Sequence, residues 1–361
     1  MITIIIYNIV VLSTFLYIRR TKLEMLTISF SRYPVTIFFC VTLFSSNISY
    51  AEQVVVYSSR IEKLIKPMFD AFTKNTGIQV KFVTDKAGVL IARLKAEGKN
   101  THADMLITTD AGNLWLAARE GLLEPIESET LEANIPAYLR DPQKQWFGLS
   151  VRARTIVYNT HKVKPADLST YEDLANLKWM GRLCLRTSKK VYNQSLVAMM
   201  IAEHGETRSE QVVRGWVANL ATDPLSNDTK AMEFVAAGKC DVTIVNSYYY
   251  GRLIKKNPSL PLAIFWPNQA GSGVHVNISG AGITKNARNK HAAIMLLEFL
   301  SSKKAQNLFA DVNMEYPANP KIKPDSAVIA WGSFKQNQMN VVAAGELQTE
   351  AVKLMDRAGY R

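Results

Sequence analysis

The sequence has little cysteine and lacks the short motifs that mark several common enzyme classes. Only three cysteines occur among its 361 residues. It contains no GxSxG, no Walker-type phosphate loop and no CxxC pair, so none of the enzyme classes marked by these motifs is indicated. It also lacks an internal repeat, a low-complexity tract and a flexible linker.

A long basic stripe is missing too, although the chain carries a formal net charge of +12. The basic residues are scattered in ones and twos, as at Lys189-Lys190 and Lys255-Lys256. They are not interleaved with aromatic residues, so we expect no binding to nucleic acid. A basic surface can still attract an anionic or acidic partner.

After residue 51 no segment is apolar enough to span a membrane, and residues 1–51 read as a targeting segment. Two apolar runs, 1–18 and 35–43, each lie next to basic residues, and Ser49 and Ala51 provide the small residues of a signal-peptidase site. We expect cleavage before Glu52 and export. Met25 is an alternative true start, because residues 25–51 alone have the layout of a signal peptide. The alternative is a membrane-spanning segment over residues 1–18, which is short for that purpose.

The remaining residues, about 310 in number, suit two lobes better than one small core. Apolar strand-like and helix-like segments alternate along the chain, which predicts an α/β fold with mostly parallel sheets flanked by helices. The predicted strands are 53–57, 78–83, 103–108, 181–186, 241–246 and 279–283. The predicted helices are 61–75, 87–97, 112–120, 194–204, 208–220 and 290–301.

A β-rich run over residues 146–159 is a candidate crossing between the lobes. We assign residues 52–154 plus about 279–329 to lobe 1. We assign about 155–278 plus 330–361 to lobe 2. Two lobes joined by more than one crossing leave a cleft at the hinge, where such sheets bind ligands.

Tyrosines mark the candidate site. Tyr192 stands alone, whereas Tyr248, Tyr249 and Tyr250 form a run. Phenolate oxygen is a hard anionic donor, and three phenolates would cancel the charge of one ferric ion. Free tyrosine titrates at about 10, so only a strong Lewis acid would keep several of them ionised at neutral pH. Tyrosine runs also occur on half-buried strands and at interfaces.

Two cysteines follow the same spacing. Cys184 precedes Tyr192 by eight residues, and Cys240 precedes Tyr248 by eight. Cys40 lies in the predicted targeting segment, so cleavage leaves two cysteines. Each opens a strand-like run, and an even number of cysteines in an exported chain favours a disulfide. Such a bond would fix the relative position of the two loops expected to carry the tyrosines. The alternative is two buried free thiols.

Several segments together resemble the bacterial extracellular solute-binding proteins of type II topology. These segments are VVVYSSR, ADMLITTDAGNLWLAAREGLLEP and WFGLSVRARTIVYN. Three others, CLRTSKKVYNQSLVAMMIA, AGKCDVTIVNSYYYGR and EYPANP, resemble the ferric-iron-binding branch. The resemblance covers essentially all of residues 52–361 and implies a two-lobed periplasmic binding fold.

The resemblance also implies a ligand set. Tyr192, Tyr248 and Tyr249 match the family's ferric ligands, and Tyr250 is expected to pack behind the pair. Arg60 matches an arginine that in some members holds a carbonate or bicarbonate anion completing the metal shell. A planar anion of this kind suits the fork of a guanidinium group.

The sequence departs from some relatives directly after this arginine. They have His and Tyr as further ligands where this chain has Ile61 and Glu62, which leaves a protein ligand from lobe 1 in doubt. Asp110 lies near a carboxylate ligand of another branch, but its setting is equally that of a helix N-cap. Arg152, with its neighbour Arg154, either adds positive charge behind the site or forms a salt bridge at the hinge.

Three functions follow from these observations. The first is a monomeric periplasmic carrier of Fe³⁺, of the Gram-negative type, that delivers iron to an inner-membrane ABC permease and its ATPase. The second is a carrier of the same fold for an oxyanion, a polyamine or a vitamin. The third is an iron-dependent enzyme, for which His102 and Asp104 have part of the required ligand spacing.

Overall fold

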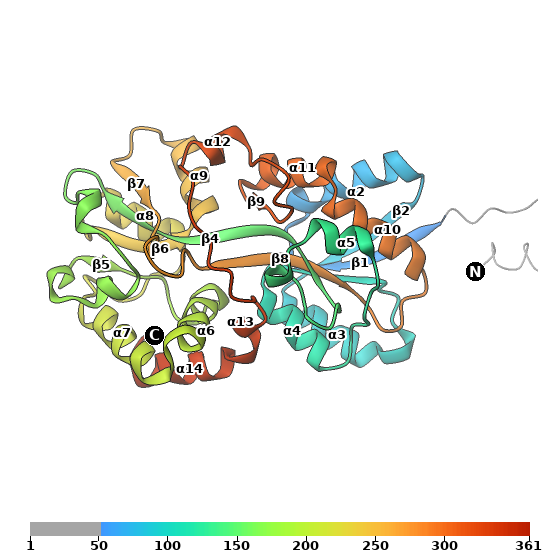
Figure 1. Ribbon diagram of the computed structural model, residues 1–361, viewed down its shortest axis with the longest axis horizontal. Coiled ribbons are helices and arrows are strands. Elements are labelled where there is room, and N and C mark those ends of the chain that lie inside the picture. The colour runs from blue at the N-terminus through green and yellow to red at the C-terminus, as the bar shows by residue number, and fades with distance from the viewer. Residues whose placement is uncertain (1–51) are drawn as a thin grey trace, which may run out of the picture. The chain divides into compact units, whose positions relative to one another are not determined.

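The structure is a computed structural model that describes residues 52–361. The predicted targeting segment therefore lies outside the described residues. Among the described helices, none combines the length and the apolar character needed to cross a membrane. The chain folds as an α/β protein with two lobes, and two long strands, β4 and β8, run side by side between them (Figure 1).

The first lobe is built on three parallel strands. β1 (Gln53–Ser58) lies between β2 (Gln79–Thr84) and β3 (Met105–Thr108). The helices that connect or follow these strands are α2 (Glu62–Thr76), α3 (Ala87–Glu97) and α4 (Ala111–Arg119). In α2, buried Ile65, Met68, Phe69 and Phe72 recur at helical spacing and form the face turned to the sheet. Gly77 ends this helix in the left-handed conformation that glycine adopts without steric cost.

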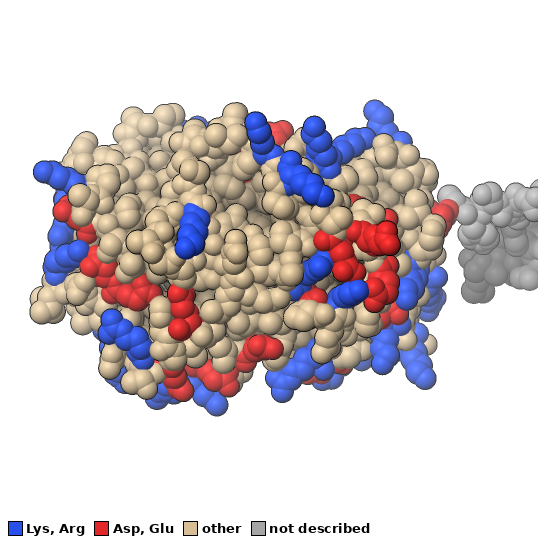
Figure 2. Space-filling model, in the orientation of Figure 1, with Lys and Arg blue, Asp and Glu red and all other residues tan. Residues whose placement is uncertain are grey.

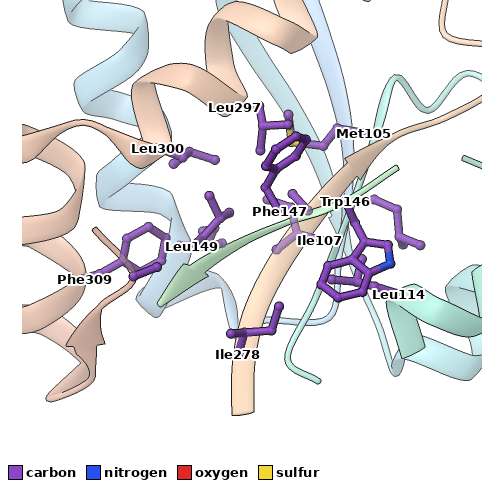
Figure 3. Packing of buried hydrophobic residues seen from close by; sticks show 14 of the residues in the cluster. Met105, Ile107, Leu114, Trp146, Phe147, Leu149, Ile278, Leu297, Leu300 and Phe309 are labelled. Atoms are coloured by element: carbon purple, nitrogen blue, oxygen red, sulfur yellow. The ribbon is translucent and has the colours of Figure 1, made fainter. Parts of the chain in front are cut away.

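The core of the first lobe gathers around the start of β4 (Phe147–Asn159). Figure 3 shows Phe147 and Leu149 of this strand among side chains of β3, β8 and two later helices, including Leu297 and Phe309. These two helices are α10 (Lys290–Ser301) and α11 (Lys303–Asn313). Segments far apart in the chain therefore share one core.

The second lobe has its own core and a smaller sheet. β5 (Leu183–Cys184) pairs in parallel with β6 (Val242–Asn246), which pairs with the far half of β4. β7 (Leu262–Phe265) also pairs with β4. The helices of this lobe are α6 (Val191–His204), α7 (Glu206–Ala218), α8 (Asp228–Ala236), α9 (Ser247–Lys256) and α14 (Gln348–Arg357).

Hydrogen bonds along β4 and β8 (Val276–Ile283) join both parts into one strand order, β2-β1-β3-β8-β4-β6-β5. β4 changes its main partner from β8 to β6 between Ala153 and Arg154. Both long strands run antiparallel to their neighbours. Among the named strands of residues 52–361, the parallel pairs are β1–β2, β1–β3 and β5–β6. The remaining elements are α5 (Glu129–Asn134), β9 (Tyr316–Pro317), α12 (Ser326–Ile329) and α13 (Ala343–Glu346).

The exact limits of the lobes stay a prediction. Tyr248, Trp266, Val274 and Val276 fall in the predicted second lobe, yet they are buried with the core of the first. These residues lie where the two lobes approach one another, so residue numbers alone do not assign them to one lobe.

A disulfide joins Cys184 to Cys240, as expected, with 5.8 Å between the two Cα atoms. Cys184 lies in β5 and Cys240 just before β6, so the bond reinforces the short parallel pairing of these two strands. The two cysteines are 0% and 2% exposed, so the bond is part of the core.

Charged residues are dispersed over the surface. On the face shown in Figure 2, lysine and arginine side chains occur in separate small groups, and acidic side chains gather between them. No continuous basic stripe crosses this face of residues 52–361, as the sequence predicts.

Candidate metal centre

A cleft of about 500 Å³ contains all three predicted tyrosine ligands. Tyr192, Tyr248 and Tyr249 all line it. The other lining residues come from both lobes and are Ser59, Arg60, Ile61, Leu64, Lys86, Ala87, Gly88, Thr109, Asn113, Arg152, Lys189, Lys190, Val191, Arg252 and Glu315. Residues far apart in the sequence thus meet at one site.

The fold brings the tyrosines together because β5 and β6 are parallel neighbours. The carboxyl ends of parallel strands share one edge of a sheet, and the chain enters a helix after each strand. Tyr192 is the second residue of α6, and Tyr248 and Tyr249 are the second and third residues of α9. The expectation that these tyrosines lie in loops is therefore wrong, since they occupy the first turns of two helices.

The three phenol groups are close to one another. The ring centroids of Tyr248 and Tyr249 are 4.3 Å apart. The Tyr248 phenol oxygen accepts a hydrogen bond from Asn246 Nδ2 at 3.2 Å. Tyr192 and Tyr248 are 9% and 5% exposed, and Tyr249 is half-buried.

Burial and mutual proximity make ionisation of Tyr248 difficult. Burial raises the pKa of the Tyr248 phenol well above its usual value, and the neighbouring Tyr192 and Tyr249 raise the pKa further. The phenol is therefore protonated at neutral pH until a strong Lewis acid displaces the proton.

Cations surround the tyrosines. The Lys190 ammonium lies 4.8 Å from the ring centroid of Tyr192, and the Arg152 guanidinium lies 5.4 Å from the same centroid. The Arg252 guanidinium lies 4.8 Å from the ring centroid of Tyr248. These positive charges favour anionic phenolates and any other anion that enters the cleft.

Arg60 reaches the cleft, but its guanidinium already has an anionic partner. Its Nη2 lies 3.0 Å from Glu315 Oε1, and both side chains are almost completely buried. Its Nη1 also donates to Ser150, Ser279 and Glu315. An anion held by Arg60 would therefore compete with Glu315 or use Nε, which has no hydrogen-bond partner in the described structure.

Arg152 is the other buried arginine of the cleft wall, at 3% exposure. It forms no ion pair within residues 52–361 and donates instead to the backbone carbonyls of Thr109 and Ile278. Its neighbour Arg154 forms a salt bridge, with Nη1 at 2.9 Å from Asp228 Oδ2. The two arginines therefore differ. Arg154 forms a salt bridge, whereas Arg152 places an unpaired positive charge beside Tyr192 within residues 52–361.

The first lobe presents no additional tyrosine or histidine to the cleft. Ile61 lines it and is 61% exposed, and Glu62, also exposed, begins α2. Glu315 is the one carboxylate among the residues that line the cleft. Because Ile61 and Glu62 stand where some relatives have His and Tyr, the first-lobe side of the cleft lacks that pair of ligands.

Asp110 does not line the cleft and caps α4 instead. Its Oδ1 accepts from the Gly112 backbone N–H at 2.8 Å. Its Oδ2 accepts from Ser195 Oγ at 3.0 Å and from Asn277 Nδ2 at 2.9 Å. Burial raises the pKa of this carboxyl to about 6, although Arg152 opposes that rise.

Tyr250 lies outside the cleft. Its ring packs edge-on against Trp331, with 6.0 Å between the centroids. Glu315, Arg252 and Lys190 do line the cleft, and sequence reasoning did not single them out. Glu315 lies in the segment EYPANP and Arg252 in NSYYYGR. Both segments resemble the ferric-iron-binding branch, but the resemblance did not identify these two side chains as part of the cleft.

The partial ligand spacing at His102 and Asp104 does not form a metal site. Asp104 is fully buried and accepts hydrogen bonds from the backbone N–H groups of Val55, Arg288 and Asn289. Across residues 52–361, no three His, Cys, Asp or Glu side chains are arranged to hold a metal ion.

Known proteins similar to this chain include one protein family and several individual relatives. Residues 67–336 match the family model described as bacterial extracellular solute-binding protein. The chain is 42% identical over 316 residues to iron uptake protein A1 of Synechocystis, a match covering 86% of this chain and 88% of the relative. It is 25% identical over 317 residues to the major ferric iron-binding protein of Neisseria meningitidis, covering 85% and 93% of the two chains.

Solved structures agree with this assignment. The Trichodesmium protein IdiA (FutA), described as in complex with iron and citrate ligands, superimposes with a TM-score of 0.83 at 46% identity. This match covers 86% of this chain and 100% of the other. Ferric iron-binding protein A of Mannheimia haemolytica, in an open conformation, gives a TM-score of 0.81 at 39% identity, covering 86% and 99%.

These relatives confirm the two-lobed binding-protein fold and the expectation that the chain is not an enzyme. The family match spans most of the described residues, and its description fits an exported protein. The chain belongs to the family of bacterial extracellular solute-binding proteins.

Proposed function

We propose that this protein binds ferric iron in the cleft through the phenolate oxygens of Tyr192, Tyr248 and Tyr249. The observation that carries the proposal is the meeting of three phenol groups from two helix starts in one cleft lined by cations. Three phenolates neutralise one ferric ion, and hard oxygen donors suit a hard cation. The printed names of the relatives, which refer to iron uptake and ferric iron binding, support the same cargo.

We also propose that the protein works in the periplasm and delivers its iron to an ABC-type permease and its ATPase. Solute-binding proteins of this family serve such importers, and the predicted signal segment supports export. We expect a monomer that presents its closed, iron-loaded form to the permease. Protonation of the phenols would aid release, because protons compete with the metal for the same oxygens.

An anion completes the metal shell in this proposal. Three phenolates leave ferric coordination positions open, and the cleft carries more cations than carboxylates. Carbonate or bicarbonate is the expected anion, and a cleft of about 500 Å³ also has room for a larger carboxylate such as citrate. Arg152 is an alternative to Arg60 as its holder, because Arg60 is already paired with Glu315.

The alternative function is transport of a different solute, with the tyrosines acting as an aromatic box. The number and closeness of the phenols do not exclude a cationic organic ligand by themselves. The positive charges of Lys190, Arg152 and Arg252 disfavour a polyamine. An oxyanion alone would not need three adjacent phenols.

Ferric loading of residues 52–361 tests the proposal. After exposure to ferric nitrilotriacetate and removal of unbound metal, we expect one iron per chain and a red to orange colour from phenolate-to-iron charge transfer. A colourless protein that retains no iron would favour the other-solute alternative. Binding of iron together with turnover of a second substrate would favour an enzyme.

Loading in bicarbonate-free buffer, with and without added bicarbonate or citrate, tests the anion. We expect iron to be retained more firmly when either anion is present, and the band to differ between the two. Arg60→Met combined with Glu315→Gln removes the ion pair without leaving a buried charge. If this double variant keeps the full bicarbonate effect, Arg60 is not the anion holder.

A further inference from the structure

The first turn of α6, which carries the candidate ligand Tyr192, has no side-chain cap of its own. The helix begins at Val191, and Lys190 before it makes no capping hydrogen bond with its side chain. Helix ends leave backbone groups without intrahelical partners, and an uncapped end frays more easily. The position of Tyr192 therefore depends on contacts from outside the helix.

Asn193, which directly follows Tyr192, makes most of these contacts. It is 4% exposed, and its Nδ2 donates to the Arg186 backbone carbonyl at 3.0 Å and to the Tyr360 hydroxyl at 2.8 Å. Its Oδ1 accepts from Arg154 Nη2. One buried amide thus joins the first turn of α6 to three distant parts of the chain.

Tyr360, which follows α14, completes this network. Its ring belongs to the core of the second lobe and is 3% exposed. Its hydroxyl accepts the hydrogen bond from Asn193 and donates its own to the Arg186 carbonyl. The same hydroxyl therefore contacts both the residue after Tyr192 and the segment that leads from β5 into α6.

α14 holds this region at two further points, and it runs beside α6 (Figure 1). At its start, Gln348 Nε2 donates to Gln194 Oε1 at 2.9 Å. Beyond its end, the Arg361 carbonyl accepts from the Ser188 N–H at 3.1 Å. The two ends of the α14 segment are thus fixed on either side of Tyr192.

We propose that Tyr360 is a positioning residue for the metal ligand Tyr192 and that it acts through Asn193. The proposal rests on the proposed function and deepens it. Groups that hold a metal ligand in its orientation typically change metal affinity 10–100-fold when they are lost. The hydroxyl is the acting part of Tyr360, because it is the only polar atom of a side chain whose ring packs in the core.

Tyr360→Phe tests this role, since it removes the hydroxyl and keeps the ring. We expect ferric binding to weaken about 10-fold or more, measured by competition with a chelator of known affinity. We also expect less visible absorbance per bound iron, because a displaced Tyr192 oxygen overlaps less with the metal. Far-UV circular dichroism at the same temperature checks that the variant is folded.

Tyr171→Phe is the matched control. Tyr171 belongs to the same core and is also 3% exposed. Its hydroxyl likewise donates once and accepts once, with the Arg154 carbonyl and the His275 backbone N–H as partners. Neither backbone group lies in α6, so we expect this variant to lose stability to a similar extent while its iron affinity and its absorbance per iron change much less.

A double variant tests the route through Asn193. Residues in one hydrogen-bond network have non-additive effects, so Tyr360→Phe should weaken binding little further once Asn193→Ala is present. If Tyr360→Phe does not fold, Asn193→Ala, which removes the same hydrogen bond from the other side, is compared with Tyr171→Phe instead.

The outcomes separate this inference from the function on which it rests. Unchanged affinity and absorbance in folded Tyr360→Phe, or a loss no larger than that of Tyr171→Phe, overturns the positioning role and leaves iron binding in place. An undiminished effect of Tyr360→Phe beside Asn193→Ala overturns the route. A colourless, iron-free unmodified protein overturns both the inference and the proposed function.

Discussion

At the scale of single residues, the direction of a side chain decides which tyrosines line the cleft. Tyr248, Tyr249 and Tyr250 are consecutive, yet only the first two line the cleft. Successive helical residues point about 100° apart, and Tyr250 consequently turns toward Trp331. Its chemistry is the same, but its surroundings give it a packing role.

Replacement of a cleft tyrosine by phenylalanine removes one phenolate and keeps the ring. We expect Tyr192→Phe or Tyr248→Phe to weaken ferric binding by more than the 10–100-fold that loss of an outer-shell partner typically costs, about two orders of magnitude or more. The charge-transfer band should shift or disappear. Competition with a chelator of known affinity measures the binding, and Tyr250→Phe is the matched control, expected to bind normally. Full-strength binding and an unchanged spectrum in both cleft variants would place the site elsewhere.

Asp110 gives a pH-dependent prediction at the same scale. Its pKa is raised from 3.8 to about 6 in the folded chain, mainly by burial. Between about pH 4 and 6 the unfolded chain therefore holds fewer protons at this position, and the stability that the group contributes falls as pH rises. Asparagine does not titrate and still caps a helix.

We therefore expect Asp110→Asn to become more stable relative to the unmodified, metal-free protein as pH rises from 4 to 7. A shift of about two pKa units corresponds to at most about 3 kcal/mol. Urea unfolding at several pH values measures the difference. A difference that does not change with pH, or that changes in the opposite direction, contradicts the raised pKa.

At the scale of helices and strands, the alternation along the sequence predicted most elements of the first lobe. The run 53–57 became β1, and the segments around α2, α3 and α4 were placed to within a few residues. Apolar periodicity and glycine stops are local signals, so they are readable without the fold. The mixture of parallel and antiparallel strand pairs could not be predicted from the sequence, because strand order depends on pairings between segments that are distant in the chain.

The helix that carries Tyr248 and Tyr249 was missed for a physical reason. Aromatic runs favour strands, and Asn246 at the start of α9 makes no side-chain capping bond that would mark a helix. α6 likewise begins without such a bond, at Lys190. The sequence singled out the three tyrosines that line the cleft. It gave no sign of the ion pair between Arg60 and Glu315, because these residues are 255 positions apart in the chain.

The disulfide acts at this scale, because it reinforces β5 against β6 directly before the two tyrosine-bearing helices. It closes a loop with a sequence separation of 56. On the chain-entropy model its loss costs about 4 kcal/mol. We expect the double variant Cys184→Ala and Cys240→Ala to unfold at a correspondingly lower denaturant concentration and to bind iron more weakly. Unchanged unfolding in both oxidised and reduced unmodified protein would show that the bond contributes little.

At the scale of the whole molecule, the two lobes meet at the cleft through a few polar contacts. Ser195 of α6 donates to Asp110 at the start of α4, and Arg252 of α9 donates to the Asn313 carbonyl. Both contacts come from helices that carry candidate ligands. In the proposed mechanism, metal binding at the tyrosines is therefore linked to the approach of the lobes, as in a hinge equilibrium that a ligand shifts.

Small-angle scattering tests this link. We expect ferric loading to reduce the radius of gyration of residues 52–361, and Ser195→Ala to enlarge it in the metal-free protein. A hydrogen bond to a charged group contributes about 1.5–3 kcal/mol, enough to change the populations of open and closed forms. Identical scattering with and without iron in the unmodified protein would separate binding from closure.

The central claim is that one ferric ion is bonded to the phenol oxygens of Tyr192, Tyr248 and Tyr249. A crystal structure of the iron-loaded protein, with anomalous scattering measured at the iron absorption edge, tests it most directly. The account predicts a single strong anomalous peak in the cleft within bonding distance of all three oxygens. A peak at another place, or a cleft without iron in crystals of loaded protein, would contradict it.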